Sequence, residues 1–257
     1  MKPEIAHQAS VAHKQITSLG DQKYPSFELR AVFAYLSAQG HGLWCQQLRN
    51  QLALSDYDLQ RPFVPSHIAL EGLNRVIEQF YEPGLGCDIA QTYSLSDLGA
   101  IGVCMGSVAT LGEAMDISQT YYELLGSFTD IVNIVDEHSF TNRLVDVAKL
   151  DPRVLQFLFE LTVTGMIKLG EEISGQRVNI FCVRFSASLS EAAKARFAAL
   201  YHCPIEDNCK FNECVIDMKS MALRVTHNLY SPQEATVNLK SLLDELHEEQ
   251  GLVDNID

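Results

Sequence analysis

Positive charge is scarce in this sequence. It contains 19 lysines and arginines against 33 aspartates and glutamates, which gives a formal net charge of −14. A surface with this balance repels a phosphate backbone instead of neutralising it. We therefore do not expect the chain as it stands to bind DNA or RNA well.

Long hydrophobic runs are also missing. The longest uncharged stretch, residues 31–48, is interrupted by serine, glutamine, glycine and histidine, and residues 1–20 contain no apolar core of a secretory signal. The first stretch is too polar to span a bilayer, and the second gives no reason to expect export. The sequence predicts a cytoplasmic protein that does not contact a membrane.

The seven cysteines do not form the pattern of a disulfide framework, because their number is odd and they are widely spread. The one group worth weighing as a metal site is His202, Cys203, Cys209 and Cys214, and its spacing contains no Cys-x-x-Cys knuckle. Cys209 and Cys214 would also point to opposite faces of a strand. We expect small buried hydrophobic side chains here and no metal.

Standard catalytic and cofactor motifs are absent as well. There is no Gly-Lys-Ser/Thr loop, no Gly-x-Ser-x-Gly elbow and no His-Glu-x-x-His, and Gly84-x-Gly86-x-x-Ile89 lacks the third glycine of a dinucleotide fingerprint. No cofactor and no catalytic residue is predicted. Because a dispersed triad leaves no such trace, an enzyme stays an alternative reading.

What is present is enough apolar sequence for a sizeable core, since 47% of the 257 residues are hydrophobic and 20% are charged. Apolar residues recur at helical spacing from Leu29 to Leu36, where Gly40 then acts as a stop. The same spacing runs from Leu70 to Phe80, with Ser66 as the expected cap. The first eighty residues are therefore predicted to be mostly helical.

Helices and strands alternate after residue 94. Capping boxes are expected at Ser94-x-x-Asp97, Thr110-x-x-Glu113 and Ser188-x-x-Glu191, with the second opening a helix as far as Leu125, and Asp151-Pro152 opens a long helix closed by Gly170 or Gly175. Strands are expected at residues 128–135, 140–147, 178–185 and 211–218, the first two joined in a hairpin. The order predicts an α+β fold, in which an N-terminal helical part precedes a small antiparallel or mixed sheet packed with helices.

The chain is expected to divide into a flexible arm at residues 1–24, a folded domain at residues 25–230 and a helix with an acidic linker at residues 231–257. The last part begins with Ser231-Pro232 and repeats leucine at four- and three-residue steps, at Leu239, Leu242 and Leu246. This stripe packs either on its own domain or on a second subunit, in which case the three leucines form the dimer contact.

Several aromatic and polar side chains have the chemistry of a ligand pocket: Tyr24, Tyr35, His41, Trp44, Tyr121, Tyr122 and Arg184. For each of them, simple packing is the competing interpretation. Arg184 is notable because it interrupts an apolar strand, where a charge needs a partner or an anionic ligand. The candidate ligand-binding residues are Tyr35, His41, Trp44, Tyr121 and Arg184.

The most specific pattern lies at residues 96–114. Ser96-Asp97-Leu98-Gly99-Ala100-Ile101-Gly102 and Ser107-Val108-Ala109-Thr110-Leu111-Gly112-Glu113-Ala114 resemble the "sDLGxLGyxxxsSxTLGeAL" motif of the N-terminal, arabinose-binding-like regulatory domain of AraC/XylS-type transcription regulators. Its glycines let a short helical segment lie against neighbouring backbone, and Thr110 and Glu113 set the start of the next helix.

Further segments extend the resemblance over about residues 27–223. They are Pro83-Gly84-Leu85-Gly86, Val183-x-Phe185 and Cys203-Pro204-Ile205. His202, Asp207 and Cys214 depart from the family pattern, which usually has glycine, an aromatic residue and leucine there.

The resemblance implies a regulatory domain that binds a small-molecule effector, forms a homodimer and controls two helix-turn-helix units that bind DNA. Those units are not expected within this chain, because only 27 residues follow Tyr230 and two such units need roughly a hundred. The alternatives are an enzyme with a dispersed active site and a dimerisation module without a ligand.

Overall fold

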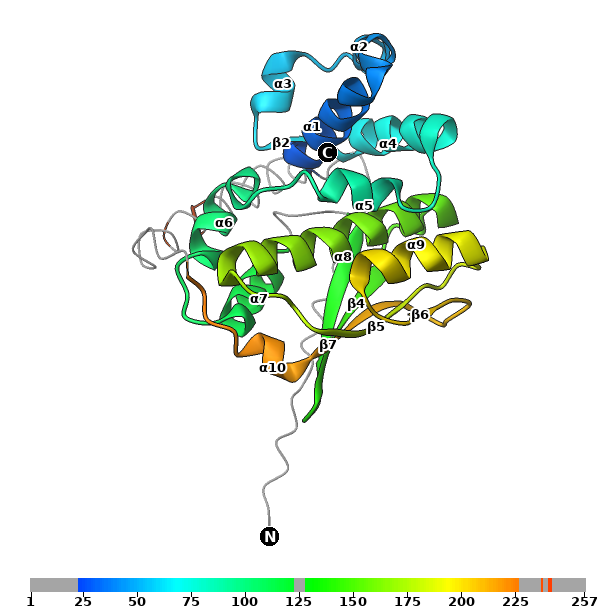
Figure 1. The fold of residues 1–257 in the computed structure, drawn as a ribbon. Coiled ribbons are helices and arrows are strands. Elements are labelled where there is room, and N and C mark those ends of the chain that lie inside the picture. Colours follow the sequence, from blue (N-terminus) through cyan, green and yellow to red (C-terminus); the bar gives the residue numbers. More distant parts are fainter. Residues whose placement is uncertain (1–22, 123–127, 227–236, 238–239, 242–257) are drawn as a thin grey trace, which may run out of the picture.

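The computed structural model describes residues 23–122, 128–226, 237 and 240–241. It shows an α+β fold in which the N-terminal helices form one part and a mixed sheet covered by helices forms the other (Figure 1). The predicted fold class is confirmed. The helices of the N-terminal part are α1 (Ser26–Leu36), α2 (Gly42–Gln51), α3 (Asp56–Gln60), α4 (Ser66–Phe80) and α5 (Leu85–Ala90), with a π-helical turn η1 (Ser37–His41) between α1 and α2.

The N-terminal part begins in a strand. β1 (Lys23–Pro25) pairs antiparallel with β2 (Phe63–Pro65), so Lys23 and Tyr24, which fall inside the expected arm, belong to a small sheet. Between α1 and α2 the chain turns at Gly40, whose φ of 92° suits glycine. The predicted cap at Ser66 is wrong: β2 runs to Pro65, which is itself the N-cap, and Ser66 already lies inside α4.

The main sheet has five strands in the order β3-β4-β7-β5-β6. Every neighbouring pair is antiparallel except β5 and β6, which are parallel. The predicted hairpin is confirmed, because β3 and β4 pair from Thr129 with Asp146 to Val135 with Phe140. The strands are β3 (Thr129–Val135), β4 (Ser139–Asp146), β5 (Ile180–Arg184), β6 (Ile205–Glu206) and β7 (Asn212–Asp217).

The long helix α8 and several shorter helices pack with this sheet. They are η2 (Leu95–Leu98), α6 (Ala100–Met105), α7 (Leu111–Thr120), α8 (Pro152–Ser174), α9 (Glu191–Tyr201) and α10 (Met218–Met221). The capping boxes at Ser94 and Thr110 are confirmed, and so are the Asp151 cap and the end of α8 at Gly175.

Besides the start of α4, two further predicted helix boundaries are wrong. The N-cap of α9 is Ser190, whose hydroxyl accepts from the Ala193 amide, because the chain is still extended at that residue. Helix α7 ends at Thr120 instead of continuing to Leu125, since Tyr121 has left helical geometry. Residues 123–127 lie outside the described residues.

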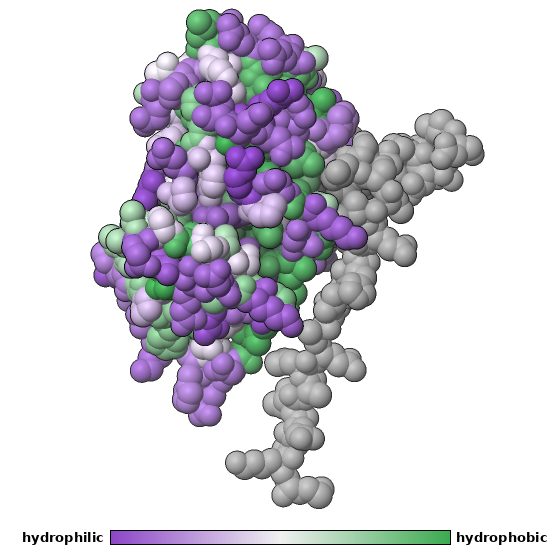
Figure 2. Space-filling model, turned by 90° about the vertical axis from the view of Figure 1, so that its right-hand side faces the viewer, coloured by the Kyte–Doolittle hydropathy of each residue, from purple (hydrophilic) through white to green (hydrophobic). Residues whose placement is uncertain are grey.

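Helix α8 joins two hydrophobic cores. Its first half contributes Val154, Phe157 and Leu158 to the core of the N-terminal helices. Further residues of the same helix, including Phe159, Val163 and Ile173, belong to the core beneath the sheet. Since one continuous helix supplies both cores, the two parts of the domain meet along α8, which crosses the middle of Figure 1. On the face shown in Figure 2, hydrophilic residues predominate, with smaller groups of hydrophobic residues between them.

Candidate functional site

A cavity of about 100 Å³ lies where the two cores meet. Phe27, Tyr93 and Leu161, which belong to the N-terminal core, line it together with Met105 and Leu111 of the sheet core. Its lining residues are buried or half-buried, and the cavity is partly open to solvent. We call this space the Glu28 cavity; its other lining residues are Glu28, Leu98, Met115, Ser118, Tyr122, Ile131, Asn142, Thr162, Gly165, Met166, Leu169 and Gly170.

The apolar wall of the Glu28 cavity comes mostly from α7 and α8. Gly165 lets α8 approach the Tyr93 ring, since an added Cβ would lie 3.2 Å from a ring carbon. At Gly170, an added Cβ would lie 3.3 Å from a methyl carbon of Leu111 on α7. Three methionines complete the wall, and their flexible thioethers adapt to differently shaped occupants.

Among the described residues that line the cavity, Glu28 supplies the only acidic group, and none is a lysine, arginine or histidine. It lies in the first turn of α1, where the helix dipole favours a negative charge. The Tyr24 hydroxyl, one helical turn earlier, donates a hydrogen bond to the Glu28 carboxylate. Burial raises the pKa of this carboxyl to about 7, and the hydrogen bond from Tyr24 opposes the increase.

Two further polar atoms are buried at this site without a hydrogen-bond partner among the described residues. They are the Tyr93 hydroxyl and the Asn142 Oδ1, whose residues are 5% and 1% exposed. The Asn142 amide nitrogen donates to Asn133, so that only its oxygen lacks a partner there. Buried polar atoms are nearly always hydrogen-bonded in native proteins, and each exception calls for an explanation.

A concave, mostly apolar space with a few polar groups is the usual form of a small-molecule site. The Glu28 cavity has this form, and its carboxyl group is hydrogen-bonded to the Tyr24 hydroxyl.

Two larger hollows, of about 710 Å³ and about 540 Å³, have a different lining. The larger lies between α1, α2 and α3 and includes the exposed side chains of Gln46, Asn50 and Gln60. The other lies along α8 and α9 and includes exposed Gln91, Arg177 and His202. Both hollows are lined partly by exposed polar groups, which water already solvates, whereas the described residues that line the Glu28 cavity are buried or half-buried.

The residues selected from sequence lie elsewhere. His41 and Trp44 pack on the same ring, that of Phe80, with centroid distances of 4.5 Å and 4.7 Å. The Tyr35 hydroxyl donates to Asp88 at 3.3 Å, and Arg196 binds the same carboxylate. Their role in ligand binding stays a prediction.

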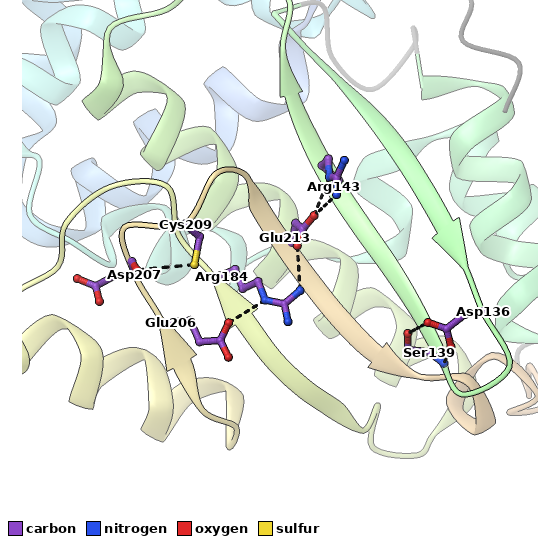
Figure 3. Close-up of polar contacts among 8 residues, drawn as sticks. All are labelled: Asp136, Ser139, Arg143, Arg184, Glu206, Asp207, Cys209 and Glu213. Carbon is purple, nitrogen blue, oxygen red and sulfur yellow. Dashed lines mark hydrogen bonds and ion pairs between the residues drawn. The ribbon is translucent and has the colours of Figure 1, made fainter.

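Arg184 has its charge partners within the sheet (Figure 3). Its guanidinium binds Glu206 at 2.8 Å and Glu213 at 3.0 Å, and Arg143 of β4 binds the other oxygen of Glu213 at 2.6 Å. The partner that this charge requires is therefore supplied by carboxylates of β6 and β7. An anionic ligand is not needed to explain an arginine in this strand.

The last candidate, Tyr121, is buried in the sheet core and directly precedes Tyr122, which does line the Glu28 cavity. Leu239, Leu242 and Leu246 lie outside the described residues. Sequence reasoning missed Glu28, Tyr93 and Asn142. A signal existed only for Glu28, which stands four residues after Tyr24, but an acid in a first helical turn is ordinary at a surface.

The proposed interpretation of the cysteines agrees with their positions, since six of the seven are buried. Within the described ranges, no three side chains of histidine, cysteine, aspartate or glutamate gather closely enough to hold a metal ion. Among the helices that the structure describes, none combines the length and the apolar character needed to cross a bilayer.

Comparison with known proteins gives the family of this α+β domain. The chain belongs to the family described as the arabinose-binding domain of AraC transcription regulators, N-terminal, which matches residues 42–225. This is a family of transcription regulator domains and not of enzymes.

A solved structure supports the fold. The crystal structure of the transcriptional regulator CdpR from Pseudomonas aeruginosa is similar over 78% of this chain, with a TM-score of 0.57 and 14% sequence identity. The similar part spans 58% of the length of that protein. No curated protein matches the chain in sequence.

Proposed function

We propose that this chain is the effector-binding part of an AraC-type transcription regulator and that the effector occupies the Glu28 cavity. The observation that carries the proposal is a mostly apolar cavity whose lining includes Tyr93 and Asn142, each with a buried polar atom that has no partner in the described part of the chain. A small ligand would satisfy those atoms, and its binding would require no chemistry.

A route from the cavity to the following chain supports this role. Residues 223–226, which we call the connecting segment, are held by backbone hydrogen bonds at Leu111 (2.9 Å), Ala109 (3.1 Å) and Ile173 (2.8 Å). Leu111 itself lines the Glu28 cavity, and Ile173 lies one turn of α8 beyond Leu169, which also lines it. An effector that shifts α7 against α8 therefore moves two of the anchors of this segment.

The effector acts by favouring one of two arrangements of α7, α8 and the connecting segment, in proportion to its difference in affinity for them. In an AraC-type regulator this difference reaches helix-turn-helix units that contact DNA. The regulator works as a homodimer, in which Leu239, Leu242 and Leu246 provide a contact between subunits.

A thermal-shift screen of the chain against small metabolites tests the function. A ligand at 100 times its Kd stabilises the fold by about 2.7 kcal/mol, which raises Tm by roughly 5–11 °C for a domain of this size. Ser118→Leu tests the location, since the longer side chain from α7 fills part of the cavity. Any ligand found is expected to lose its effect in this variant.

Ser118→Ala is the matched control. It removes the same hydrogen bond, from the Ser118 hydroxyl to the Met115 carbonyl, without filling space. The proposal requires ligand binding to persist in Ser118→Ala. A ligand that shifts the Tm of Ser118→Leu as strongly as that of the unmodified chain would place the effector site elsewhere.

A further inference from the structure

We infer that the Glu28 cavity is built for a small organic cation, a primary ammonium group on a short apolar body, held by the Glu28 carboxylate and the Tyr93 hydroxyl. This inference rests on the proposed function and names the chemical class of its effector. It follows from three features of the cavity: the sign of its charge, the kind of polar atom that lacks a partner, and its size.

The negative charge of Glu28 favours a positively charged ligand. Among the described residues that line the cavity, Glu28 is the only one with a formal charge, and none of them is basic. The groups that face it are the phenols of Tyr24, Tyr93 and Tyr122, whose own pKa values are all raised by burial, so they stay neutral. A buried carboxylate without a cation is costly, and an ammonium ion removes that cost.

The polar atoms without a hydrogen-bond partner favour a ligand that donates hydrogen bonds. The Asn142 Oδ1 only accepts hydrogen bonds, the Glu28 carboxylate does the same when ionised, and the Tyr93 hydroxyl oxygen is able to accept. An ammonium group brings three N–H donors and no acceptor. An alcohol of the same length brings one donor and no charge, and a carboxylate brings a second negative charge next to Glu28, which disfavours it.

The size of the cavity limits the apolar part. A closed apolar cavity of about 150 Å³ accommodates benzene, whereas this cavity measures about 100 Å³. At comparable packing that volume suits about four non-hydrogen atoms. Met105, Met115 and Met166 give the wall some adaptability at the apolar end. n-Butylammonium, with four carbons and one nitrogen, exceeds this by one atom, which the flexible methionine side chains accommodate, and it serves as the probe.

Cation binding at Glu28 is expected to depend on pH in a way that distinguishes it from the binding of a neutral ligand. In the free protein the pKa of this carboxyl is raised to about 7 by burial, so a cation binds best after the proton has left. Affinity for n-butylammonium is therefore expected to increase roughly tenfold from pH 6 to pH 8, where the amine itself stays protonated. Asp97 acts on Tyr93 and Asp130 acts on Tyr122, and both raise the pKa of the tyrosine that they act on.

The test compares n-butylammonium, 1-butanol and butyrate by isothermal titration calorimetry on the full chain at pH 6, 7 and 8. The cation is expected to bind at least tenfold more tightly than the alcohol at pH 8, and butyrate is expected not to bind. Glu28→Gln keeps the shape of the side chain and removes the charge, so it should lower cation affinity tenfold or more and leave the alcohol unaffected.

Two further variants protect the test against a simple loss of folding. Glu71→Gln on α4 changes an exposed carboxylate paired with Arg75 and is expected to leave binding unchanged. Tyr93→Phe keeps the ring and removes only the hydroxyl that lacks a partner, so it should weaken the cation several-fold even if Glu28→Gln does not fold.

The outcomes separate this inference from the proposed function. If 1-butanol or butyrate binds as tightly as the cation, or if cation affinity does not change with pH or in Tyr93→Phe, the inference is wrong. If none of the three probes binds, the inference is wrong as well. The proposed function then still stands where another ligand from the metabolite screen is lost in Ser118→Leu, and it falls where no such ligand exists.

Discussion

Glu160 gives the sharpest test of how the two parts of the domain are held together. This side chain of α8 is fully buried and binds three donors: the Tyr81 hydroxyl at 2.9 Å, the Gly86 amide at 3.1 Å and the Gln156 amide at 3.2 Å. The donors favour the carboxylate, but burial outweighs them and raises its pKa to about 7. Folding therefore couples to a proton near neutral pH.

The sign of the coupling follows from the two pKa values. At pH 5.5 the unfolded chain has lost the proton of this carboxyl, whose ordinary pKa is 4.5, whereas the folded chain retains it. Raising the pH towards 7 removes this advantage of the folded state, so stability falls. With a folded pKa of about 7, the loss amounts to about 2 kcal/mol between pH 5.5 and pH 7.5.

Glu160→Gln isolates this contribution, because the amide does not titrate. Free energies of unfolding are measured by urea denaturation of both proteins from pH 5.5 to 7.5, above the isoelectric point of about 4.9. The free energy of the unmodified chain is expected to fall by about 2 kcal/mol relative to that of the variant. Glu71→Gln, at an exposed position, should show no such divergence.

Parallel pH profiles for the unmodified chain and Glu160→Gln would refute the reasoning. They would mean that the three donors keep the buried carboxylate ionised across the whole range. A uniform offset between the profiles is not decisive for this point, because the amide also changes the hydrogen bonds of Tyr81 and Gly86 at every pH.

Two further predictions concern packing and assembly. Gly102→Ala should destabilise the fold by about 1–3 kcal/mol in urea denaturation, because its Cβ would lie 2.0 Å from the Leu95 carbonyl oxygen. The control Gly42→Ala, whose Cβ would have its nearest neighbour at 3.8 Å, should be neutral or slightly stabilising. An equal loss of unfolding free energy in both variants would contradict this reasoning. Replacing Leu239, Leu242 and Leu246 together with alanine should weaken homodimerisation at least about tenfold in analytical ultracentrifugation, and an unchanged equilibrium would remove their assigned role.

The Gly102 position shows how well local chemistry could be predicted. The motif around it was interpreted as a close approach of backbones, and the structure places the Leu95 carbonyl where a side chain would otherwise stand. The Thr110 capping box and the Asp151 cap were predicted for the same reason, because a cap depends on residues three positions apart or fewer. The two misplaced caps, at Ser66 and Ser188, had the right residue types next to the wrong boundary.

Arg184 shows where the sequence stops being informative. A charge in an apolar strand needs a partner, and that requirement was evident from the sequence alone. Its identity was not, because Glu206 and Glu213 meet Arg184 only once β6 and β7 take their places on either side of β5. The sequence alone does not distinguish an anionic ligand from an ion-pair partner within the chain, whereas the folded structure does.

The sequence by itself determined the longer helices, the hairpin of β3 and β4, the strands β5 and β7, the caps at Ser94, Thr110 and Asp151, and the family, since each depends on neighbouring residues or on a contiguous motif. Only the tertiary structure decided the Glu28 cavity. Its polar atoms come from α1, the turn before η2 and strand β4, and its apolar wall comes mostly from α7 and α8. These segments are far apart in the chain and face one space because α8 supplies residues to both cores.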